Sequence, residues 1–105
     1  MTHPRDRLIV ALDVPNVEEA KALIETLGDS VGVYKIGLEL LFSGGFALAQ
    51  ELAHHGRPVF VDAKLLDIEA TVERATAAIA RMDVAFLTVH ALDCKTLAGA
   101  VSGRG

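Results

Sequence analysis

Tryptophan is absent from this sequence, and aromatic residues are scarce, at 5% of 105 positions. The core must therefore be built from Val, Leu, Ile and Ala, a composition that suits helices packed on a parallel sheet. Cys94 is the only cysteine, so an internal disulfide is excluded, which fits a reducing compartment and a cytoplasmic protein. Apolar residues make up 51% of the chain and charged residues 23%, as in a globular rather than a disordered protein.

Long apolar runs are also missing. Residues 8–12 form a short apolar run, whereas a helix that spans a bilayer needs about 20 such residues, and the N-terminus lacks the apolar stretch of a secretory signal. The formal net charge of −4 gives no reason to expect nucleic-acid binding, although it is compatible with an anionic small-molecule substrate. We therefore expect neither a membrane nor a nucleic-acid partner.

Four short apolar segments predict β-strands, and a segment with helical spacing follows each of them. The strands are expected at residues 7–13, 31–37, 58–64 and 84–90. The first helix should begin after Asn16, where Glu19 completes a capping-box spacing, and should end at Gly28. Further helices are expected at residues 46–55 and 69–82, with a fourth from Cys94 or Lys95, and residues 38–45 are interpreted as a loop or short turn.

The alternation of strands and helices predicts an α/β fold with a parallel sheet, because right-handed crossovers connect successive parallel strands. Four β/α units are half of a (β/α)8 TIM barrel, which typically contains about 250 residues. Four open units would leave two exposed edge strands, and the chain stops inside a predicted helix. We therefore expect residues 1–105 to be the N-terminal half of a single barrel domain, in a truncated or cleaved chain. A compact flavodoxin-like domain is the alternative.

Charged residues stand at the C-terminal ends of the predicted strands, where the active sites of barrel enzymes are assembled. Asp62 and Lys64 share one face of the third strand, because residues two apart point the same way. Asp13, Lys35 and His90 lie at the ends of the other three strands. A single charge in such a position is usually just solvated, but several charges on an inward face are costly unless they are paired. The alternating lysines and aspartates would satisfy one another, and they predict an active site.

Three separated motifs occur in order along the chain. They are Leu-Ile-Val-Ala-Leu-Asp at 8–13, Tyr-Lys-Ile-Gly-Leu-Glu-Leu at 34–40 and Asp-x-Lys-x-x-Asp-Ile at 62–68. Together they resemble the orotidine 5'-phosphate decarboxylases, and the similarity continues through Thr-Val-His-Ala at 88–91. The resemblance implies an enzyme without cofactor or metal that converts orotidine 5'-phosphate to uridine 5'-phosphate.

The resemblance also implies a role for four of the strand-end residues. Lys64 would protonate C6 of the pyrimidine after carbon dioxide leaves, and Asp62 would lie next to the substrate carboxylate. Lys35 would pair with Asp62 and contact the ribose, and Asp13 would bind ribose hydroxyls. A fixed ammonium group at C6 suits this reaction, because the carbanion formed there has no conjugated electron sink.

A homodimer whose active site is shared across the interface is implied as well. Asp67 resembles the second aspartate of the family, which reaches the active site of the partner subunit, and Ile68 and Thr71 would accompany it. The chain departs from the family pattern here, because Glu69 and an alanine precede Thr71 where Pro-Asn is usual. The phosphate-binding elements of the family lie in the second half of the barrel, so the 105-residue chain alone is expected to be inactive.

Two other functions remain open. The 3-hexulose-6-phosphate synthases and 3-keto-gulonate-phosphate decarboxylases share the Asp-x-Lys-x-x-Asp signature, but they hold Mg²⁺ with an acidic residue where this chain has Lys35. The second alternative is an inactive half-barrel that serves as a dimerisation module.

His54 and His55 are interpreted as cations at a helix end rather than as metal ligands, and Cys94 as an unreactive thiol.

Overall fold

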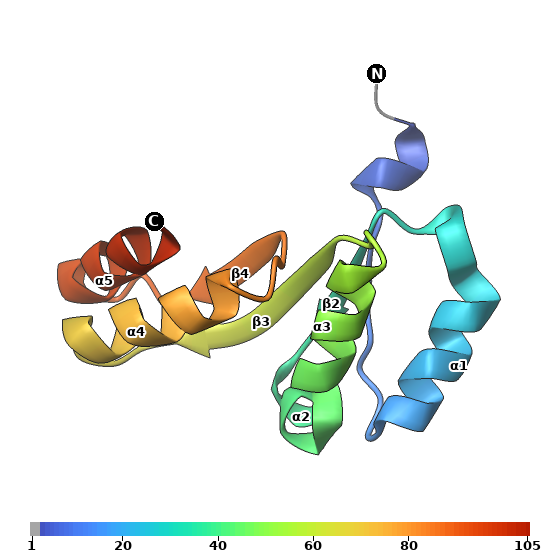
Figure 1. Cartoon of the computed structure of the whole chain (residues 1–105), viewed down its shortest axis with the longest axis horizontal. Helices are drawn as coiled ribbons and strands as arrows, with labels where there is room; N and C mark the ends of the chain where they lie inside the picture. Colours follow the sequence, from blue (N-terminus) through green and yellow to red (C-terminus); the bar gives the residue numbers. More distant parts are fainter. Residues whose placement is uncertain (1–2) are drawn as a thin grey trace.

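The computed structural model describes residues 3–105 and contains four β/α units in chain order (Figure 1). The elements are η1 (Pro4–Arg7), β1 (Ile9–Ala11), α1 (Val17–Leu27), η2 (Gly28–Ser30), β2 (Val33–Ile36), α2 (Leu38–Leu40), η3 (Leu41–Gly45), α3 (Phe46–His54), β3 (Val59–Leu65), α4 (Glu69–Ala80), β4 (Phe86–Val89) and α5 (Cys94–Arg104). The strands form one parallel sheet in the order β1-β2-β3-β4, which confirms the predicted parallel α/β organisation. This sequential order excludes a flavodoxin-like domain, in which the second strand lies outside the first.

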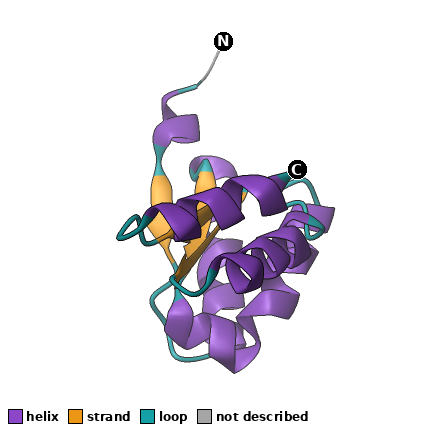
Figure 2. Cartoon of the chain, turned by 90° about the vertical axis from the view of Figure 1, so that its left-hand side faces the viewer, coloured by secondary structure: helices purple, strands orange, loops and turns teal. Residues whose placement is uncertain are grey.

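The hydrophobic core lies between one face of the sheet and the α-helices, which pack beside the strands (Figure 2). Four strand residues on this face are at most 2% exposed: Tyr34, Ile36, Val59 and Val61. The register aligns one residue from each strand in a row on the opposite face: Ala11, Lys35, Phe60 and Phe86. Because successive side chains of a strand point to opposite faces, the strands divide into a core-facing set and a second set that is free to form a site.

The predicted ends of the first helix are confirmed. Asn16 caps α1, and its side-chain oxygen accepts a hydrogen bond from the backbone N–H of Glu19 at 2.9 Å. The helix ends at Gly28, whose φ of +52° lies in the left-handed region that favours glycine. The last helix, α5, begins at Cys94, which is one of the two starting points predicted from the sequence, and Asp93 is its N-cap.

Several strands are shorter than the apolar segments that predicted them. The sequence predicts a first strand at residues 7–13, but β1 covers Ile9–Ala11, and Asp13 lies beyond its end. Likewise, β4 covers Phe86–Val89 rather than residues 84–90. Both strands are at the edges of the described sheet and pair on one side only. The residues just beyond them still make single backbone hydrogen bonds to the neighbouring strand, as Leu12 does to Lys35 and His90 to Leu65, but they lie outside the paired register.

The interpretation of residues 38–45 as a loop is wrong, because this segment is mostly helical. α2 and η3 continue into α3, with a bend at Ser43 and at Gly44, whose φ is +97°. Leu40 and Leu41 are at most 3% exposed, so the segment is held by apolar contacts with the core. The glycine pair marks the bend and not the end of the helical structure, because the apolar residues before it provide a buried face.

Helices α4 and α5 lie side by side in both views of the chain (Figures 1 and 2). Their close approach depends on Gly99 and Gly103, which are one turn apart on α5. A Cβ atom at Gly99 would lie 2.5 Å from the carbonyl oxygen of Glu69, and one at Gly103 would overlap the carbonyl oxygen of Glu73. The two glycines therefore allow the backbones of both helices to come into contact.

We expect Gly103→Ala to lower the free energy of unfolding by about 2 kcal/mol, because the added methyl group overlaps α4. In an unconstrained helix the same change would be stabilising. Ser102→Ala, at an exposed neighbouring position of the same helix, is the matched control and should be close to neutral. Urea unfolding monitored by circular dichroism measures both values, and a stabilised Gly103→Ala variant would contradict the packing described here.

Candidate active site

Asp62 on β3 is the centre of a group of charges at the C-terminal end of the sheet. The ammonium nitrogen of Lys64 lies 2.7 Å from Oδ2 of Asp62, and that of Lys35 lies 3.3 Å from the same oxygen. Asp62 itself is 6% exposed, whereas the side chains of Lys35 and Lys64 are 27% and 48% exposed. A buried carboxylate is thus paired with two ammonium groups that remain accessible from outside.

The strand that carries Asp62 is irregular at this point. The flanking register pairs are Val61 with Leu87 and Leu65 with Val89. Three residues of β3, Asp62, Ala63 and Lys64, therefore lie opposite the single residue Thr88 of β4. Lys64 has a φ of +50°, in the left-handed region that residues other than glycine rarely adopt. Side chains of a strand alternate between its two faces, and β3 has two extra residues at this point. The residues before and after the irregularity therefore still point to the same faces, and the core-facing residues of β3 continue to face the core.

Thr88 is a member of this site that sequence reasoning missed. Its hydroxyl donates a hydrogen bond to Oδ1 of Asp62 at 2.7 Å and accepts one from the backbone N–H of Lys64 at 3.0 Å. Alternation along β4 places it on the same face as Phe86, whose ring lies 6.0 Å from that of Phe60. The alternation of side chains along the fourth strand can place Thr88 on this face from the sequence alone. The hydrogen bonds of Thr88 cannot be predicted in this way, because they depend on the irregular register between β3 and β4.

The electrostatics of the site favour an ionised Asp62. The hydrogen bond from Lys64 is the main reason that the pKa of Asp62 falls from 3.8 to about 2, and hydrogen bonds from Thr88 and Lys35 act in the same direction. Burial of the carboxyl group opposes this change. The carboxylate is therefore charged throughout the physiological pH range and is available to orient both lysines.

Asp13 lies near this cluster but outside its network of contacts. It follows β1, and its Oδ1 atom would be 3.8 Å from a Cβ atom placed at Gly37, just after β2. Its side chain is exposed and makes no ion pair within residues 3–105. The structure therefore places Asp13 at the same end of the sheet as Lys35, with a free carboxylate.

Asp67, Ile68 and Thr71 form a separate group in the connection from β3 to α4. Oδ1 of Asp67 accepts a hydrogen bond from the backbone N–H of Ile68 at 2.7 Å, and the ion pairs around Asp62 involve Lys35 and Lys64 but not Asp67. Ile68 directly precedes α4 and is 69% exposed, while Thr71 in the first turn is half-buried. The structure therefore does not bring this group into the same site within one chain.

The histidine pair and the cysteine that stand out in the sequence do not form a cluster of charged groups like the one around Asp62. The rings of His54 and His55 pack edge to face at the end of α3, with centroids 5.6 Å apart, and Cys94 is an exposed free thiol. Among residues 3–105, no group of three or more His, Cys, Asp or Glu side chains could hold a metal ion. In the same part of the chain, every helix is too short or too polar to cross a membrane.

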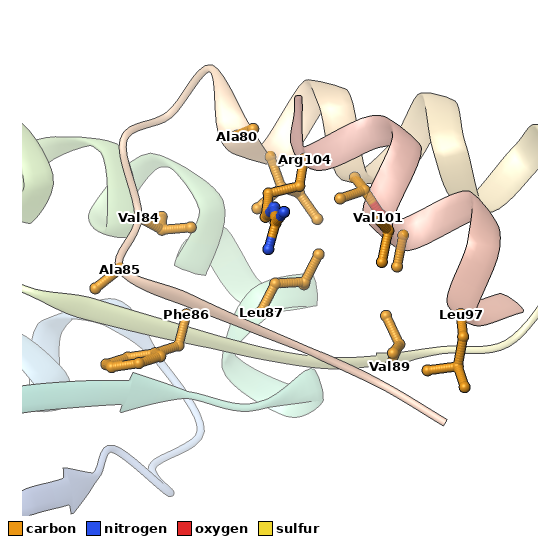
Figure 3. Close-up of a pocket in the computed structure, with 12 residues that line it drawn as sticks. Ala80, Val84, Ala85, Phe86, Leu87, Val89, Leu97, Val101 and Arg104 are labelled. Atoms are coloured by element: carbon orange, nitrogen blue, oxygen red, sulfur yellow. The ribbon is translucent and has the colours of Figure 1, made fainter. Parts of the chain in front are cut away.

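An apolar groove lies between β4, α4 and α5 (Figure 3). Aliphatic side chains such as Leu87, Val89 and Val101 line it, and Arg104 provides a charged group. The residues predicted to act on a substrate are absent from its lining. The charged end of β3 is therefore the better candidate for an active site.

Comparison with known proteins identifies the family. A family model described as "Orotidine 5'-phosphate decarboxylase / HUMPS family" matches residues 6–104. The chain belongs to this family. It is 56% identical to an orotidine 5'-phosphate decarboxylase from Bradyrhizobium sp. strain BTAi1 over 95% of its length, and 54% identical to one from Rhodopseudomonas palustris strain HaA2 over 96%.

The orotidine 5'-phosphate decarboxylase / HUMPS family also supplies a structural match. The crystal structure of orotidine 5'-phosphate decarboxylase from Lactobacillus acidophilus superposes with a TM-score of 0.81 and 34% identity, over 91% of this chain and 46% of that one. The two bacterial relatives are longer as well, and the chain spans 41% and 43% of their lengths. The predicted fold class is confirmed: the four β/α units correspond to about half of a (β/α)8 barrel.

Asp62 should make the stability of the chain depend on pH. Its pKa is lower in the folded protein, so its contribution, about 2 kcal/mol, is complete above pH 3.8 and is lost as the pH falls towards 2. We expect Asp62→Asn to have a lower free energy of unfolding than the parent at neutral pH. As the pH falls towards 2, the free energy of unfolding of this variant should decrease less than that of the parent. Urea unfolding across this range measures the effect.

Asp13→Asn, which removes an exposed carboxylate near the same end of the sheet, is the matched control. It should leave the acid dependence of the free energy of unfolding as it is in the parent chain. Parallel pH curves for the parent and Asp62→Asn would show that the pairing of Asp62 with the two lysines is not stabilising.

Proposed function

We propose that these residues serve the decarboxylation of orotidine 5'-phosphate to uridine 5'-phosphate in the cytoplasm, without a metal or a cofactor, as the first half of a barrel enzyme. The observation that carries this proposal is the placement of Asp62 between the ammonium groups of Lys35 and Lys64, at 3.3 Å and 2.7 Å. The relatives named orotidine 5'-phosphate decarboxylase, at 50–61% identity, support the same reaction.

Lys64 is the proton donor in this proposal. Loss of carbon dioxide leaves an electron pair at C6 in the plane of the ring, outside the π system. An ammonium group held beside that carbon stabilises the developing negative charge and then transfers a proton to it. Asp62 holds the ammonium of Lys64 in place, and its own charge opposes the substrate carboxylate, a repulsion that falls as carbon dioxide departs.

Lys35 and Asp13 are the proposed contacts to the ribose. Lys35 is on the open face of the sheet in the row that includes Phe60, and the exposed carboxylate of Asp13 follows the neighbouring strand. The cation at Lys35 also argues against a Mg²⁺-dependent sister enzyme, because an ammonium group repels a divalent metal ion at the position where an acidic ligand would be needed. The pyrimidine nucleotide is therefore the proposed substrate.

Replacement of Lys64 tests this function. We propose a chimaera in which this chain replaces the segment that it matches in the Bradyrhizobium relative, so that the rest of the barrel is present. Lys64→Ala should lower kcat/KM for decarboxylation by roughly a thousandfold, because both the proton donor and the charge at C6 are lost. Release of carbon dioxide from carboxyl-labelled substrate measures the rate.

Lys21→Ala, which removes an exposed lysine paired with Glu51 on the helical side, is the matched control and should keep full activity. Full activity of Lys64→Ala would overturn the assignment of the proton donor. A parent chimaera that requires added Mg²⁺ for turnover would favour the sister enzymes instead.

We also propose that the connection between β3 and α4 binds a second copy of the chain. Three apolar side chains around Asp67 are exposed by 48–73%: Leu66, Ile68 and Leu92. A group of exposed apolar residues with charged residues beside it, here Asp67, Asp93 and Lys95, is typical of an interface with an apolar centre and a polar rim. In such a homodimer, Asp67, Ile68 and Thr71 would lie against the partner's active site.

Ile68→Lys should weaken self-association at least about tenfold, because it places a charge in the apolar part of this interface. Val101→Lys is the matched control, since Val101 is 59% exposed but lies further along α5. Sedimentation equilibrium measures both dissociation constants. A dimer that is weakened equally by the two changes, or by Val101→Lys alone, would place the interface elsewhere.

A further inference from the structure

Thr88 connects the two central residues of the candidate site from a neighbouring strand. It lies on β4, and its hydroxyl contacts the carboxylate of Asp62 and the backbone of Lys64 at the same time. A hydroxyl group has one hydrogen to donate and lone pairs to accept, and Thr88 uses both functions within this pair of contacts. A single side chain thus links the carboxylate to the chain segment that carries the ammonium group.

The first contact decides which way the carboxylate of Asp62 is turned. Oδ1 accepts the hydrogen bond from Thr88 at 2.7 Å, and Oδ2 is left to face both ammonium groups. Rotation of the carboxylate about its terminal bond would break the bond to Thr88 or the ion pairs with the lysines. The hydroxyl therefore helps to fix the plane of the carboxylate, with one oxygen towards Thr88 and the other towards the two ammonium groups.

The second contact supports the unusual backbone of Lys64. Where β3 has three residues opposite one, the regular ladder between the strands is interrupted. At this point the backbone N–H of Lys64 donates a hydrogen bond to the hydroxyl of Thr88 at 3.0 Å. This hydrogen bond helps to offset the free-energy cost of holding Lys64 at a φ of +50°. Lysine adopts this backbone conformation only when the surrounding structure enforces it.

We infer that Thr88 is a positioning residue of this site, which sets the orientation of the Asp62 carboxylate and the backbone turn at Lys64, and thereby the place of the Lys64 ammonium group. The effect of Thr88 on turnover rests on the proposed function. The effect of Thr88 on the positions of Asp62 and Lys64 does not, so the two effects can be tested separately.

Three variants separate the hydroxyl from the shape of the side chain. Thr88→Val keeps the shape and removes both hydrogen bonds, and Thr88→Ser keeps the hydroxyl with a smaller side chain. Thr26→Val makes the same chemical change on the exposed face of α1, where the hydroxyl donates only to the carbonyl of Ala22, and is the matched control. If Thr88→Val does not fold, Thr88→Ala takes its place, because it also removes the hydroxyl.

The first measurement is hydrogen exchange of the Lys64 backbone amide in this chain, followed by NMR at neutral pH. We expect Thr88→Val to lose at least tenfold in the protection of this amide relative to the amides of Val59 and Val61 in the same strand. Thr88→Ser and Thr26→Val should keep the parent value. Equal protection in all variants would overturn the positioning role, whatever the reaction is.

The second measurement is the decarboxylation rate of the chimaera described above. Thr88→Val should lower kcat by 10- to 100-fold with a much smaller change in KM, because a displaced ammonium group affects the reacting carbon more than substrate binding. Thr88→Ser should recover most of this loss, and Thr26→Val should show none.

An unchanged kcat in Thr88→Val would overturn the inference for catalysis, and a loss that Thr88→Ser does not recover would assign the effect to packing. An inactive parent chimaera would reject the proposed function, and the amide exchange would still decide whether Thr88 holds the site together.

Discussion

A buried carboxylate between two ammonium groups is the interaction on which the rest of this structure depends. Asp62 would be costly to bury as a charge, and Lys64 and Lys35 compensate that cost at 2.7 Å and 3.3 Å. The pairing holds two flexible lysine side chains in one place on the open face of the sheet. A fixed positive charge of this kind is what a developing carbanion requires.

The sheet makes this pairing possible through one regular and one irregular feature. The regular parallel register places Lys35 beside Phe60, one strand away from Asp62 and on the same face. The irregular pairing of β3 with β4 sets three residues opposite Thr88, and the turn at Lys64 follows from it. The core on the other face is undisturbed, because the alternation of side chains continues through the irregularity.

Much of the fold could be predicted because its signals are local. The Asn16 cap, the Gly28 helix end and the apolar strand segments each depend on a few adjacent residues, and the structure agrees with them. The sequence wrongly predicts a loop or short turn at residues 38–45 because the glycine pair in this segment is a strong local turn signal. The burial of Leu40 and Leu41, which makes this segment helical, depends on elements distant in the sequence.

By itself, the sequence determined the order of the strands and helices, the family and the face of β3 that carries Asp62 and Lys64, because side-chain alternation and motif spacing are properties of the chain. Only the tertiary structure decided that Lys35 and Lys64 share one oxygen of Asp62 and that Thr88 holds the other. It also separated Asp67 from this cluster. The physical reason is that these contacts join three strands, and distances between strands follow from sheet register and backbone turns rather than from any local pattern.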